Sequence, residues 1–254
     1  MPSRRASFRF YAELNDLLSR PRRFVDFEHN FQGSPSVKDV IESFGVPHTE
    51  VELILVNGEP MGFEVRLQDG DRVSVYPMFE SVDVGRETRV RAEPLRELRF
   101  VLDVHLGKLA AYLRLLGFDC LYDAGWEDEE LARVSVVEKR ILLTRDRQLL
   151  KRTVVTHAYC VRRLQATEQC VEVVRRFDLA GLAAPFTRCL RCNGRLGREE
   201  IGGFAGRIPE GVRARVSEVT RCAGCDRLYW KGTHYDRLER LARDILQRAG
   251  QPPD

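Results

Sequence analysis

The first third of the chain has the alternating and turn-rich pattern of a small β-sheet. Three short segments rich in apolar and aromatic residues predict β-strands: Phe8–Tyr11, Val51–Val56 and Arg72–Pro77. Between the first two, Ser36–Phe44 has a helical pattern with Ser36 as its N-cap. Asn57-Gly58 then marks a hairpin turn. We therefore expect a small α+β sheet packed on one helix over residues 1–95.

Over residues 98–184 the pattern changes to buried strands that alternate with amphipathic helices. Strands are predicted at Phe100–Asp103, Cys120–Tyr122, Ile141–Thr144 and Thr156–Val161. Helices are predicted at Leu106–Leu116 with Gly117 as C-cap, at Asp128–Lys139, at Arg147–Arg152, and from the cap Thr167 to Phe177. This alternation predicts a three-layer α/β domain with a mostly parallel sheet. The charged stretch 86–97, which contains Pro94, predicts a linker before it.

Two aspartates stand where predicted strands end. Asp103 closes the first strand of this domain, and Asp146 follows the third strand after one arginine. Open parallel sheets bind ligands beyond the carboxyl ends of their strands, and crowded carboxylates need a cation to neutralise them. Hard oxygen ligands suit Mg²⁺ or Mn²⁺, which usually serve phosphate chemistry. The pair therefore indicates a metal-dependent site for a phosphate ester, and simple turn chemistry at strand ends is the open alternative.

Further acids are candidates for the same site. They are Asp123, after the second strand, and the run Glu127–Glu130 at the start of the next helix. The run also fits ordinary helix electrostatics, because acids in a first turn complement the helix dipole and Asp128 is a good N-cap. Two other phosphate chemistries lack support. The chain has no G-x-G-x-x-G or G-x-x-x-x-G-K-[ST] motif, and His105 stands where an aspartyl-phosphate phosphatase would need its second aspartate.

Four of the seven cysteines form two C-x-x-C pairs near the end of the chain, with 29 residues between the pairs: Cys189, Cys192, Cys222 and Cys225. This spacing is a strong zinc pattern, and four filled ligand positions indicate a structural role for the ion. Gly194 and Gly224 are expected to supply the tight turns. The other three cysteines are expected to be buried small hydrophobes: Cys120, Cys160 and Cys170.

The composition is that of an ordinary globular protein, with 43% hydrophobic and 31% charged residues among 254. Lys and Arg against Asp and Glu number 13 to 17 in residues 1–97, 14 to 12 in 98–184 and 14 to 9 in 185–254. The basic end indicates contact with a polyanion, or simply an arginine-rich surface. Apolar runs stay below membrane-spanning length and the first residues lack a signal-peptide core, so a cytoplasmic protein without membrane contact is expected.

Residues 185–254 also interleave basic with aromatic side chains. Six arginines lie between the cysteine pairs: Arg195, Arg198, Arg207, Arg213, Arg215 and Arg221. The stretch Arg227–Tyr235 then adds Tyr229, Trp230 and His234. Stacking surfaces beside cations suit single-stranded RNA, whereas packing of the aromatic pair on the preceding domain is the alternative. The final helix, Asp236–Arg248, has one apolar face and is expected to pack on a neighbouring domain.

Several strings in the middle of the chain carry a family resemblance: FVLD at 100–103, LGKLA at 106–110, LRLLG at 113–117, LYD at 121–123, DEEL at 128–131 and RILLTRDR at 140–147. With them, residues 98–240 resemble the PIN-like ribonucleases, in particular the Mut-seven C-terminal ribonuclease family. A zinc ribbon that ends in a string similar to Tyr229–Tyr235 belongs to the same pattern. Tyr112 departs from it, because a tryptophan would be expected there.

The resemblance implies one or two divalent ions held by a few acids at the edge of the sheet. Asp103 and Asp146 are implied as ligands of Mg²⁺ or Mn²⁺, with Asp128 or Glu129 as the third and Asp123 lining the site. Lys108 and Arg145 are candidates to hold a phosphate, with a plain surface role as the alternative for both. The implied activity is metal-assisted hydrolysis of an RNA phosphodiester bond.

Two strings in the first segment carry a second resemblance: LVNGE at 55–59, and LQDGDRV at 67–73 leading into Tyr76-Pro77. They resemble ubiquitin-like β-grasp domains of the sulfur-carrier type. Members of that type end in a free Gly-Gly, whereas this chain continues through Met78–Ser81 without one. A docking or regulatory role toward a protein partner is therefore expected in place of carrier chemistry.

The expected fold is an α+β multidomain protein with three modules. They are a ubiquitin-like β-grasp domain at 1–95, a PIN-like nuclease domain at 98–184, and a zinc ribbon with a C-terminal helix at 185–254. The expected function is that of a metal-dependent ribonuclease whose zinc ribbon aids RNA binding. Two rival functions stay open, namely a non-catalytic RNA-binding adaptor and, disfavoured by the missing Gly-Gly, a sulfur-relay partner.

Overall fold

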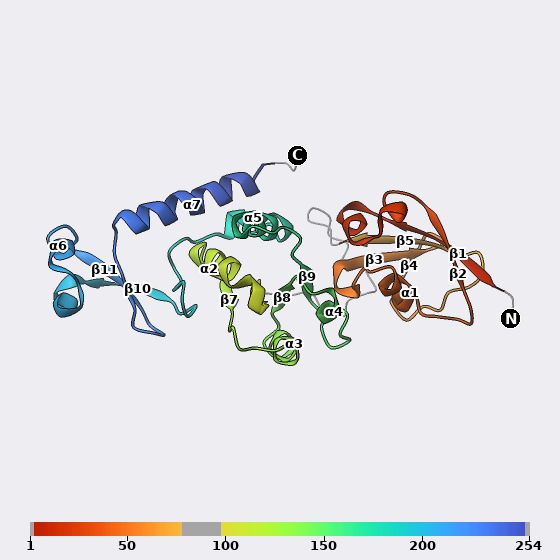
Figure 1. Cartoon of the computed structure of the whole chain (residues 1–254), viewed down its shortest axis with the longest axis horizontal. Coiled ribbons are helices and arrows are strands. Elements are labelled where there is room, and N and C mark those ends of the chain that lie inside the picture. The colour runs from red at the N-terminus through yellow and green to blue at the C-terminus, as the bar shows by residue number, and fades with distance from the viewer. Residues whose placement is uncertain (1–2, 78–97, 252–254) are drawn as a thin grey trace. The chain divides into compact units, whose positions relative to one another are not determined.

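The computed structural model describes residues 3–77 and 98–251 (Figure 1). The linker predicted at 86–97 lies outside these residues. The chain divides into two compact units, one made of Met1–Glu97 with Asp128–Cys160 and the other of Leu98–Glu127 with Val161–Asp254. In the parts of the chain that the structure describes, no helix combines the length and the apolar character needed to cross a membrane.

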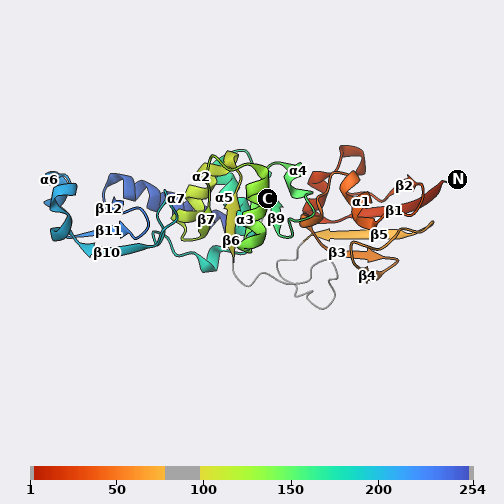
Figure 2. The same ribbon diagram turned by 90° about the horizontal axis from the view of Figure 1, so that it is seen from below.

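The N-terminal segment forms a five-stranded sheet of the expected β-grasp type, and the sequence predicted the first, third and fifth of its strands. The five strands are β1 (Arg4–Phe10), β2 (Phe27–Phe31), β3 (Val51–Val56), β4 (Glu59–Met61) and β5 (Arg72–Pro77). Their order is β2-β1-β5-β3-β4, with β1 and β5 parallel and the other pairs antiparallel (Figure 2). Three short 3-10 helices lie between the strands: η1 (Ala12–Leu17), η2 (Arg20–Arg22) and η3 (His48–Glu50).

Helix α1 (Val37–Ser43) forms where the sequence predicts it and packs on this sheet. The Ser36 hydroxyl accepts a hydrogen bond from the Asp39 backbone N–H at 3.1 Å, which confirms Ser36 as the N-cap. Phe8 is fully buried, and its ring centroid lies 5.1 Å from that of Phe44 at the end of the helix. The predicted hairpin turn is confirmed as well, because Asn57 and its following glycine both take positive φ.

Four short strands form the sheet of the α/β region, in the order β7-β6-β8-β9. They are β6 (Arg99–Leu102), β7 (Asp119–Leu121), β8 (Ile141–Thr144) and β9 (Ala158–Cys160). Strand β6 pairs in parallel with β7, and β8 pairs in parallel with β9. All four residues of β8 are buried, as a strand covered on both faces requires. The sequence therefore predicted these strands correctly, with shifts of one or two residues at the ends of some.

The helices of this region are α2 (Gly107–Leu115), α3 (Asp128–Val137), α4 (Arg147–Leu150) and α5 (Ala166–Arg176), with the 3-10 helices η4 (Val104–Leu106) and η5 (Ala180–Leu182). One predicted boundary is wrong, because Thr167 does not cap α5. Gln165 is the N-cap, with extended backbone and no side-chain cap. The Gln165 carbonyl accepts the N–H of Gln169 at 2.8 Å and so closes the first turn, which places Thr167 inside the helix.

The C-terminal segment is a three-stranded antiparallel ribbon followed by a long helix (Figure 2). Its elements are β10 (Leu196–Glu200), η6 (Ile201–Arg207), α6 (Glu210–Arg213), β11 (Glu218–Cys222), β12 (Leu228–Tyr229) and α7 (Thr233–Ala249). Helix α7 begins three residues before the predicted Asp236 and buries Ala242 and Ile245. Arg248 fixes its end to α5 through both carboxylate oxygens of Glu168, at 2.6 and 2.7 Å.

Gly117 ends α2 as the sequence predicts, and two constraints require a glycine there. Its φ of +95° lies in the left-handed region, which side chains disfavour. A Cβ atom at this position would also lie 2.3 Å from the carbonyl oxygen of Ala184. The end of α2 therefore touches the backbone that follows η5.

We expect Gly117→Ala to lower the free energy of unfolding by about 2 kcal/mol or more, because the left-handed backbone alone costs an L-residue 1–2 kcal/mol and the clash adds to it. Denaturant unfolding followed by circular dichroism measures the change. Gly70→Ala is the matched control, since Gly70 has a φ of +86° and no atom within 4 Å of a built Cβ. Equal losses in the two variants would contradict the contact with Ala184.

Candidate functional site

Asp103 lies at the end of β6, where the sequence predicts a metal ligand. Its side chain is 5% exposed and serves as the N-cap of η4, where Oδ1 accepts the backbone N–H of His105 at 3.1 Å. The Asp103 carbonyl accepts the N–H of Leu106 at 2.9 Å. Turn chemistry, the predicted alternative, is therefore present. It does not exclude metal binding, because a carboxylate offers about four lone-pair sites.

Asp146 has the same local role after β8. It is exposed and caps α4, with Oδ1 accepting the N–H of Gln148 at 2.7 Å. Its own N–H donates to Oγ1 of Thr144 at 2.9 Å. This double anchorage sets the direction of the carboxylate just beyond the strand. Arg145, the neighbouring candidate for phosphate binding, is exposed.

The loop after β7 and the start of α2 carry the next candidates. Asp123 is exposed and forms a tight turn, with Oδ1 accepting the N–H of Gly125 at 2.8 Å. Lys108 is exposed on the first turn of α2, and its Nζ lies 5.9 Å from the ring centroid of Tyr112. This cation–π geometry orients the ammonium along the helix and leaves it at the surface.

The acidic run begins α3. Asp128 and Glu129 are exposed in its first turn, whereas Glu130 is held by both carboxylate oxygens against Arg133, at 2.6 and 2.7 Å. This pair lowers the pKa of Glu130 through its hydrogen bonds to Arg133. The ion pair with Arg133 in the same helix therefore accounts for Glu130, and Asp128 and Glu129 remain the candidates of this run.

The predicted acids and bases divide between the two compact units. Asp103, Lys108 and Asp123 belong to the second unit, and the others belong to the first: Asp128, Glu129, Arg145 and Asp146. Within each unit the strand-end aspartate is held by a short helix that it caps. Their shared role as a metal site stays a prediction.

Tyr122 supports the Asp103 loop, and the sequence alone gave it no role. Its hydroxyl donates to the carbonyl of Val104 at 3.0 Å. A Cβ at Gly107 would lie 2.6 Å from the same hydroxyl, so a side chain there would displace the Tyr122 ring from this position. The signal was a glycine in the first turn of a helix, where no turn or cap requires one.

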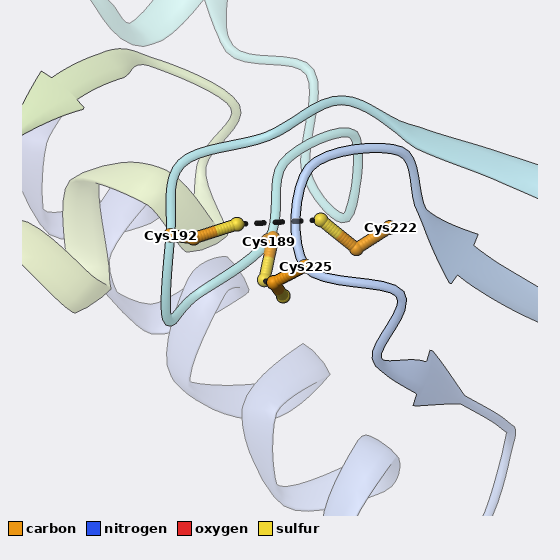
Figure 3. Close-up of side chains that lie close together, drawn as sticks. All are labelled: Cys189, Cys192, Cys222 and Cys225. Carbon is orange, nitrogen blue, oxygen red and sulfur yellow. Dashed lines mark hydrogen bonds between the residues drawn. The ribbon is translucent and has the colours of Figure 1, made fainter.

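The four cysteines of the two C-x-x-C pairs converge on one point (Figure 3). All four sulfur atoms lie within 4.8 Å of one another, with 3.6 Å between Sγ of Cys189 and Cys225 and 3.4 Å between Cys192 and Cys222. A tetrahedral ion with Zn–S bonds of about 2.3 Å sets sulfur–sulfur distances of roughly 3.8 Å. The cluster could therefore hold a metal such as zinc.

The thiols differ in their ease of ionisation. Burial would raise the pKa of Cys189, but hydrogen bonds from the Tyr229 hydroxyl at 3.0 Å and from nearby backbone N–H groups outweigh it and lower the pKa to about 6. Burial raises the pKa of Cys192 to about 12. A second thiolate so close to the first needs a cation for stabilisation, and a bound metal supplies that charge.

Glycines make room for the cluster. A Cβ at Gly194 would lie 2.9 Å from Sγ of Cys222 and 3.3 Å from Sγ of Cys192. Gly224 donates its N–H to Sγ of Cys222 at 3.4 Å. Gly194 therefore acts through close approach to the cluster, whereas Gly224 lies in a turn, as predicted. Asn193 takes the left-handed backbone, with a φ of +67°.

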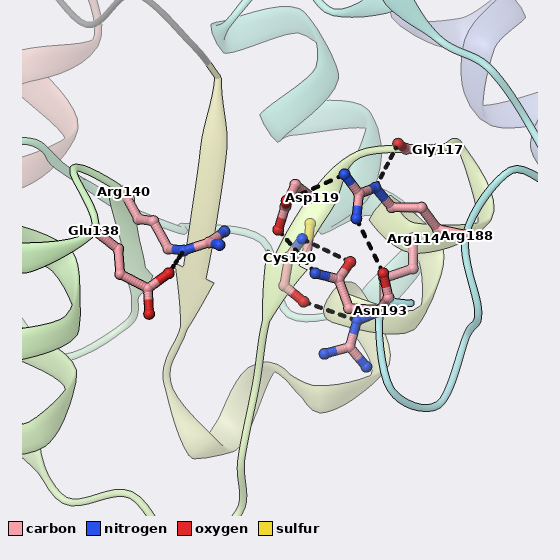
Figure 4. Close-up of polar contacts among 8 residues, drawn as sticks. All are labelled: Arg114, Gly117, Asp119, Cys120, Glu138, Arg140, Arg188 and Asn193. Atoms are coloured by element: carbon pink, nitrogen blue, oxygen red, sulfur yellow. Dashed lines mark hydrogen bonds and ion pairs between the residues drawn. The ribbon is translucent and has the colours of Figure 1, made fainter. Parts of the chain in front are cut away.

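A buried arginine attaches the first cysteine loop to the α/β region (Figure 4). Arg114 of α2 is 4% exposed. Its Nε donates to the carbonyl of Cys120 at 2.8 Å, and its Nη1 donates to the carbonyls of Leu190 and Arg191 at 3.2 and 2.9 Å. Both residues lie between the first two cysteines of the cluster. The loop that would bind the metal is thus joined to strand β7 through one guanidinium.

Asn193 and Arg188 complete this attachment (Figure 4). Asn193 accepts the N–H of Cys120 at 3.1 Å and donates to Oδ1 of Asp119 at 2.8 Å. Arg188 donates to Oδ2 of Asp119 at 3.1 Å and to the carbonyl of Gly117 at 3.2 Å. Sequence reasoning missed this network, although an asparagine directly after a C-x-x-C pair was an available signal.

The basic and aromatic residues of the ribbon have divided roles. Arg207 and Arg221 both pair with Asp226, and Tyr235 stacks on Phe186 at 4.4 Å between centroids. Tyr229 is bound to the cysteine cluster, which favours the packing interpretation for that ring. The remaining four arginines between the cysteine pairs are exposed: Arg195, Arg198, Arg213 and Arg215.

Two family models match the chain. Residues 98–242 match the Mut7-C RNAse domain, and residues 3–83 match the Mut7-C ubiquitin domain. Comparisons with curated proteins and with solved structures gave no match. The two matched ranges agree with the architecture predicted from the sequence strings. Because the first match alone spans more than half of the chain, the protein belongs to the Mut7-C RNAse domain family.

Proposed function

We propose that the protein is a divalent-metal-dependent ribonuclease that hydrolyses RNA phosphodiester bonds. The observation that carries the proposal is the RNAse-domain match over residues 98–242, because it contains strand-end aspartates of the kind that hold Mg²⁺ or Mn²⁺. The family match supports a nuclease role in general. The metal dependence, the site residues and the RNA substrate are part of the proposal.

In the proposed site, Asp103 and Asp146 are the principal ligands, Asp128 or Glu129 is the third, and Asp123 lines the site. Exposed carboxylates on the first turn of α3 and at the N-cap of α4 support these roles, since they offer hard oxygen atoms at the surface. A bound Mg²⁺ or Mn²⁺ would lower the pKa of a water molecule and stabilise charge on the leaving oxygen.

Lys108 and Arg145 are the proposed phosphate contacts. Both are exposed, and each is close in sequence to one of the two strand-end aspartates. Arg145 can hold two phosphate oxygens at once, whereas Lys108 offers a point charge at the start of α2. Their task would be to orient the RNA backbone toward the acids and to offset the negative charge that both partners bring.

We further propose that the cysteine cluster holds structural zinc and that the ribbon aids RNA binding. The four clustered thiols would fill a tetrahedral ligand set and leave none of its positions for a reacting group. The exposed arginines Arg195, Arg198, Arg213 and Arg215 would meet the phosphate backbone. The attachment of the cluster to β7 would keep this basic ribbon fixed to the nuclease region.

A non-catalytic RNA-binding adaptor is the second candidate. The specific observation in its favour is that both strand-end aspartates serve as helix N-caps, a structural role that is independent of catalysis. An adaptor would bind RNA through the ribbon in a salt-sensitive manner and would keep that binding when the acids are replaced. The sulfur-relay alternative has no such support.

Asp103→Asn and Asp146→Asn separate the metal role from the capping role, because asparagine is as good an N-cap as aspartate. We expect each variant to stay folded and to lose about 100-fold or more in the rate of RNA cleavage with Mg²⁺ or Mn²⁺, the scale on which the loss of one contact to developing charge acts. Cleavage of labelled structured and single-stranded RNAs measures the rate.

Asp39→Asn is the matched control, since Asp39 is an exposed acid in the first turn of α1. It should cleave at the rate of the wild type. RNA binding without cleavage by any form of the protein would favour the adaptor. Full activity of both strand-end variants would remove Asp103 and Asp146 from the site.

The zinc proposal predicts about one zinc ion per chain by elemental analysis. Cys189→Ser should lose the ion and unfold at a lower denaturant concentration, because metal binding contributes directly to folding. Cys170→Ala is the control, since Cys170 is buried outside the cluster and its replacement should leave the zinc content unchanged. Zinc-free protein of unchanged stability would refute a structural ion.

A further inference from the structure

Helix α4, which Asp146 caps, is anchored at both ends by the β-grasp domain. At its start, Nη1 of Arg147 donates to the carbonyl of Leu17 in η1 at 3.1 Å. Just after its end, Nζ of Lys151 donates to the carbonyl of Glu42 at the C-terminal end of α1 at 2.8 Å. Cations favour the carbonyl end of a helix, so the second contact is also electrostatically matched.

A helix as short as α4 depends on such anchors. It contains four residues, and a single turn of helix is not stable by itself. The Asp146 carboxylate is part of the same turn, because it accepts the N–H of Gln148. Arg147 lies between these two residues in the sequence. Whatever fixes Arg147 therefore also fixes the direction of the carboxylate beside it.

Gly45 of the β-grasp domain lies beside the contact between Arg147 and Leu17. A Cβ at Gly45 would lie 3.3 Å from the Leu17 carbonyl oxygen and 3.8 Å from Nη1 of Arg147. Gly45 also has a φ of +95°, which favours glycine in any case. A side chain at this position would therefore press on the Leu17 carbonyl that accepts the hydrogen bond from Arg147.

The segment after α4 is held by two buried polar side chains of the same domain. His48 is 8% exposed, and it contacts the carbonyl of Val155 through Nε2 at 3.0 Å and Glu42 Oε1 through Nδ1 at 2.7 Å. Glu50 is 1% exposed, and its carboxylate accepts the N–H of Cys160 at the end of β9. Burial would raise the pKa of Glu42, but the hydrogen bond from His48 outweighs it and lowers this pKa.

Buried groups of this kind show that the attachment is built in. A buried carboxylate or imidazole is stable only with matched partners, and separation would leave backbone groups of Val155 and Cys160 without these contacts. A domain that is joined to its neighbour only by a linker would not bury an imidazole and a carboxylate against it. The contacts run along residues 147–160, the stretch that directly follows Asp146.

We propose that the β-grasp domain is a positioning element of the nuclease site, which holds Asp146 in place through Arg147 and α4. This inference rests on the proposed ribonuclease function and assigns to the β-grasp domain the surface that positions Asp146. Arg147 is a positioning residue and touches no substrate. The β-grasp domain then serves the activity from within the chain, in addition to any contact with a protein partner.

The test uses the full chain with Arg147→Ala, Arg147→Lys and the control Arg152→Ala, which replaces an exposed arginine two residues past α4. Arg147→Ala should lower kcat about 10-fold at unchanged KM, the scale of losing an outer-shell partner. Amide hydrogen exchange at residues 147–151 should become faster in this variant. Arg147→Lys keeps a donor for the Leu17 carbonyl, so it should restore part of kcat and part of the protection from exchange. Arg152→Ala should match the wild type in both measurements.

Gly45→Ala probes the same contact from the other side. It should reproduce the loss of kcat, whereas Gly58→Ala, with a φ of +90° and no atom within 4 Å of a built Cβ, should not. Wild-type protein that cleaves no RNA would refute the nuclease proposal together with this inference. If the wild type is active but Arg147→Ala has the same kcat, or shows unchanged exchange at residues 147–151, the positioning role alone is overturned.

Discussion

The structure depends on one constraint, namely that loop carbonyls without a donor in a helix or strand need a hydrogen bond from elsewhere in the chain. Backbone oxygens that are partly removed from water need donors, and here arginine side chains from distant segments provide them. Arg114 serves the first cysteine loop, Arg188 serves the end of α2, and Arg147 serves η1. One guanidinium carries five N–H groups in a planar fork, so it can bind two or three carbonyls at once. Short elements such as α4 and the cysteine loop thereby acquire fixed positions that their own hydrogen bonds could not give.

This use of arginine changes the meaning of the charge pattern. The basic excess of residues 185–254 indicated a polyanion partner, yet several of these cations are committed within the chain. Arg188 binds Asp119, Arg207 and Arg221 bind Asp226, and Arg248 binds Glu168. The charge available to RNA is therefore smaller than the count suggests and is concentrated on the exposed arginines of the ribbon. A net charge describes solubility and attraction in general, whereas the pairing of each cation decides where a ligand can bind.

The sequence predicted elements well wherever one local signal dominates. Ile141–Thr144 forms a strand at its predicted limits because four buried apolar residues stand between polar ones, and Ser36 caps α1 because its side chain bonds within the same turn. Thr167 failed as a cap because the helix begins at Ala166, with Gln165 as its N-cap, two residues before the predicted cap. The ribbon strand Leu196–Glu200 was not predicted, since its residues are mostly exposed and carry no apolar alternation.

The candidate site shows the same division between local and distant information. Strand ends located Asp103 and Asp146, and the C-x-x-C spacing located the four cysteines that the fold brings together. The third acid could not be chosen between Asp128 and Glu129, because both occupy the first turn of α3. The contact of Arg114 with Leu190 spans 76 residues and leaves no local pattern, and the same holds for Glu50 and Cys160, 110 residues apart.

The contact between Arg147 and Leu17, which are 130 residues apart, has a consequence for folding during synthesis. Domains generally fold as they leave the ribosome, the N-terminal one first. The β-grasp sheet is complete once Pro77 has emerged, long before α4 exists. The entropy lost on closing a loop grows only slowly with its length, so the long separation between the two residues adds little to the free energy of forming this contact. The β-grasp sheet is thus made before the segment that carries Asp146, and that later segment packs on it.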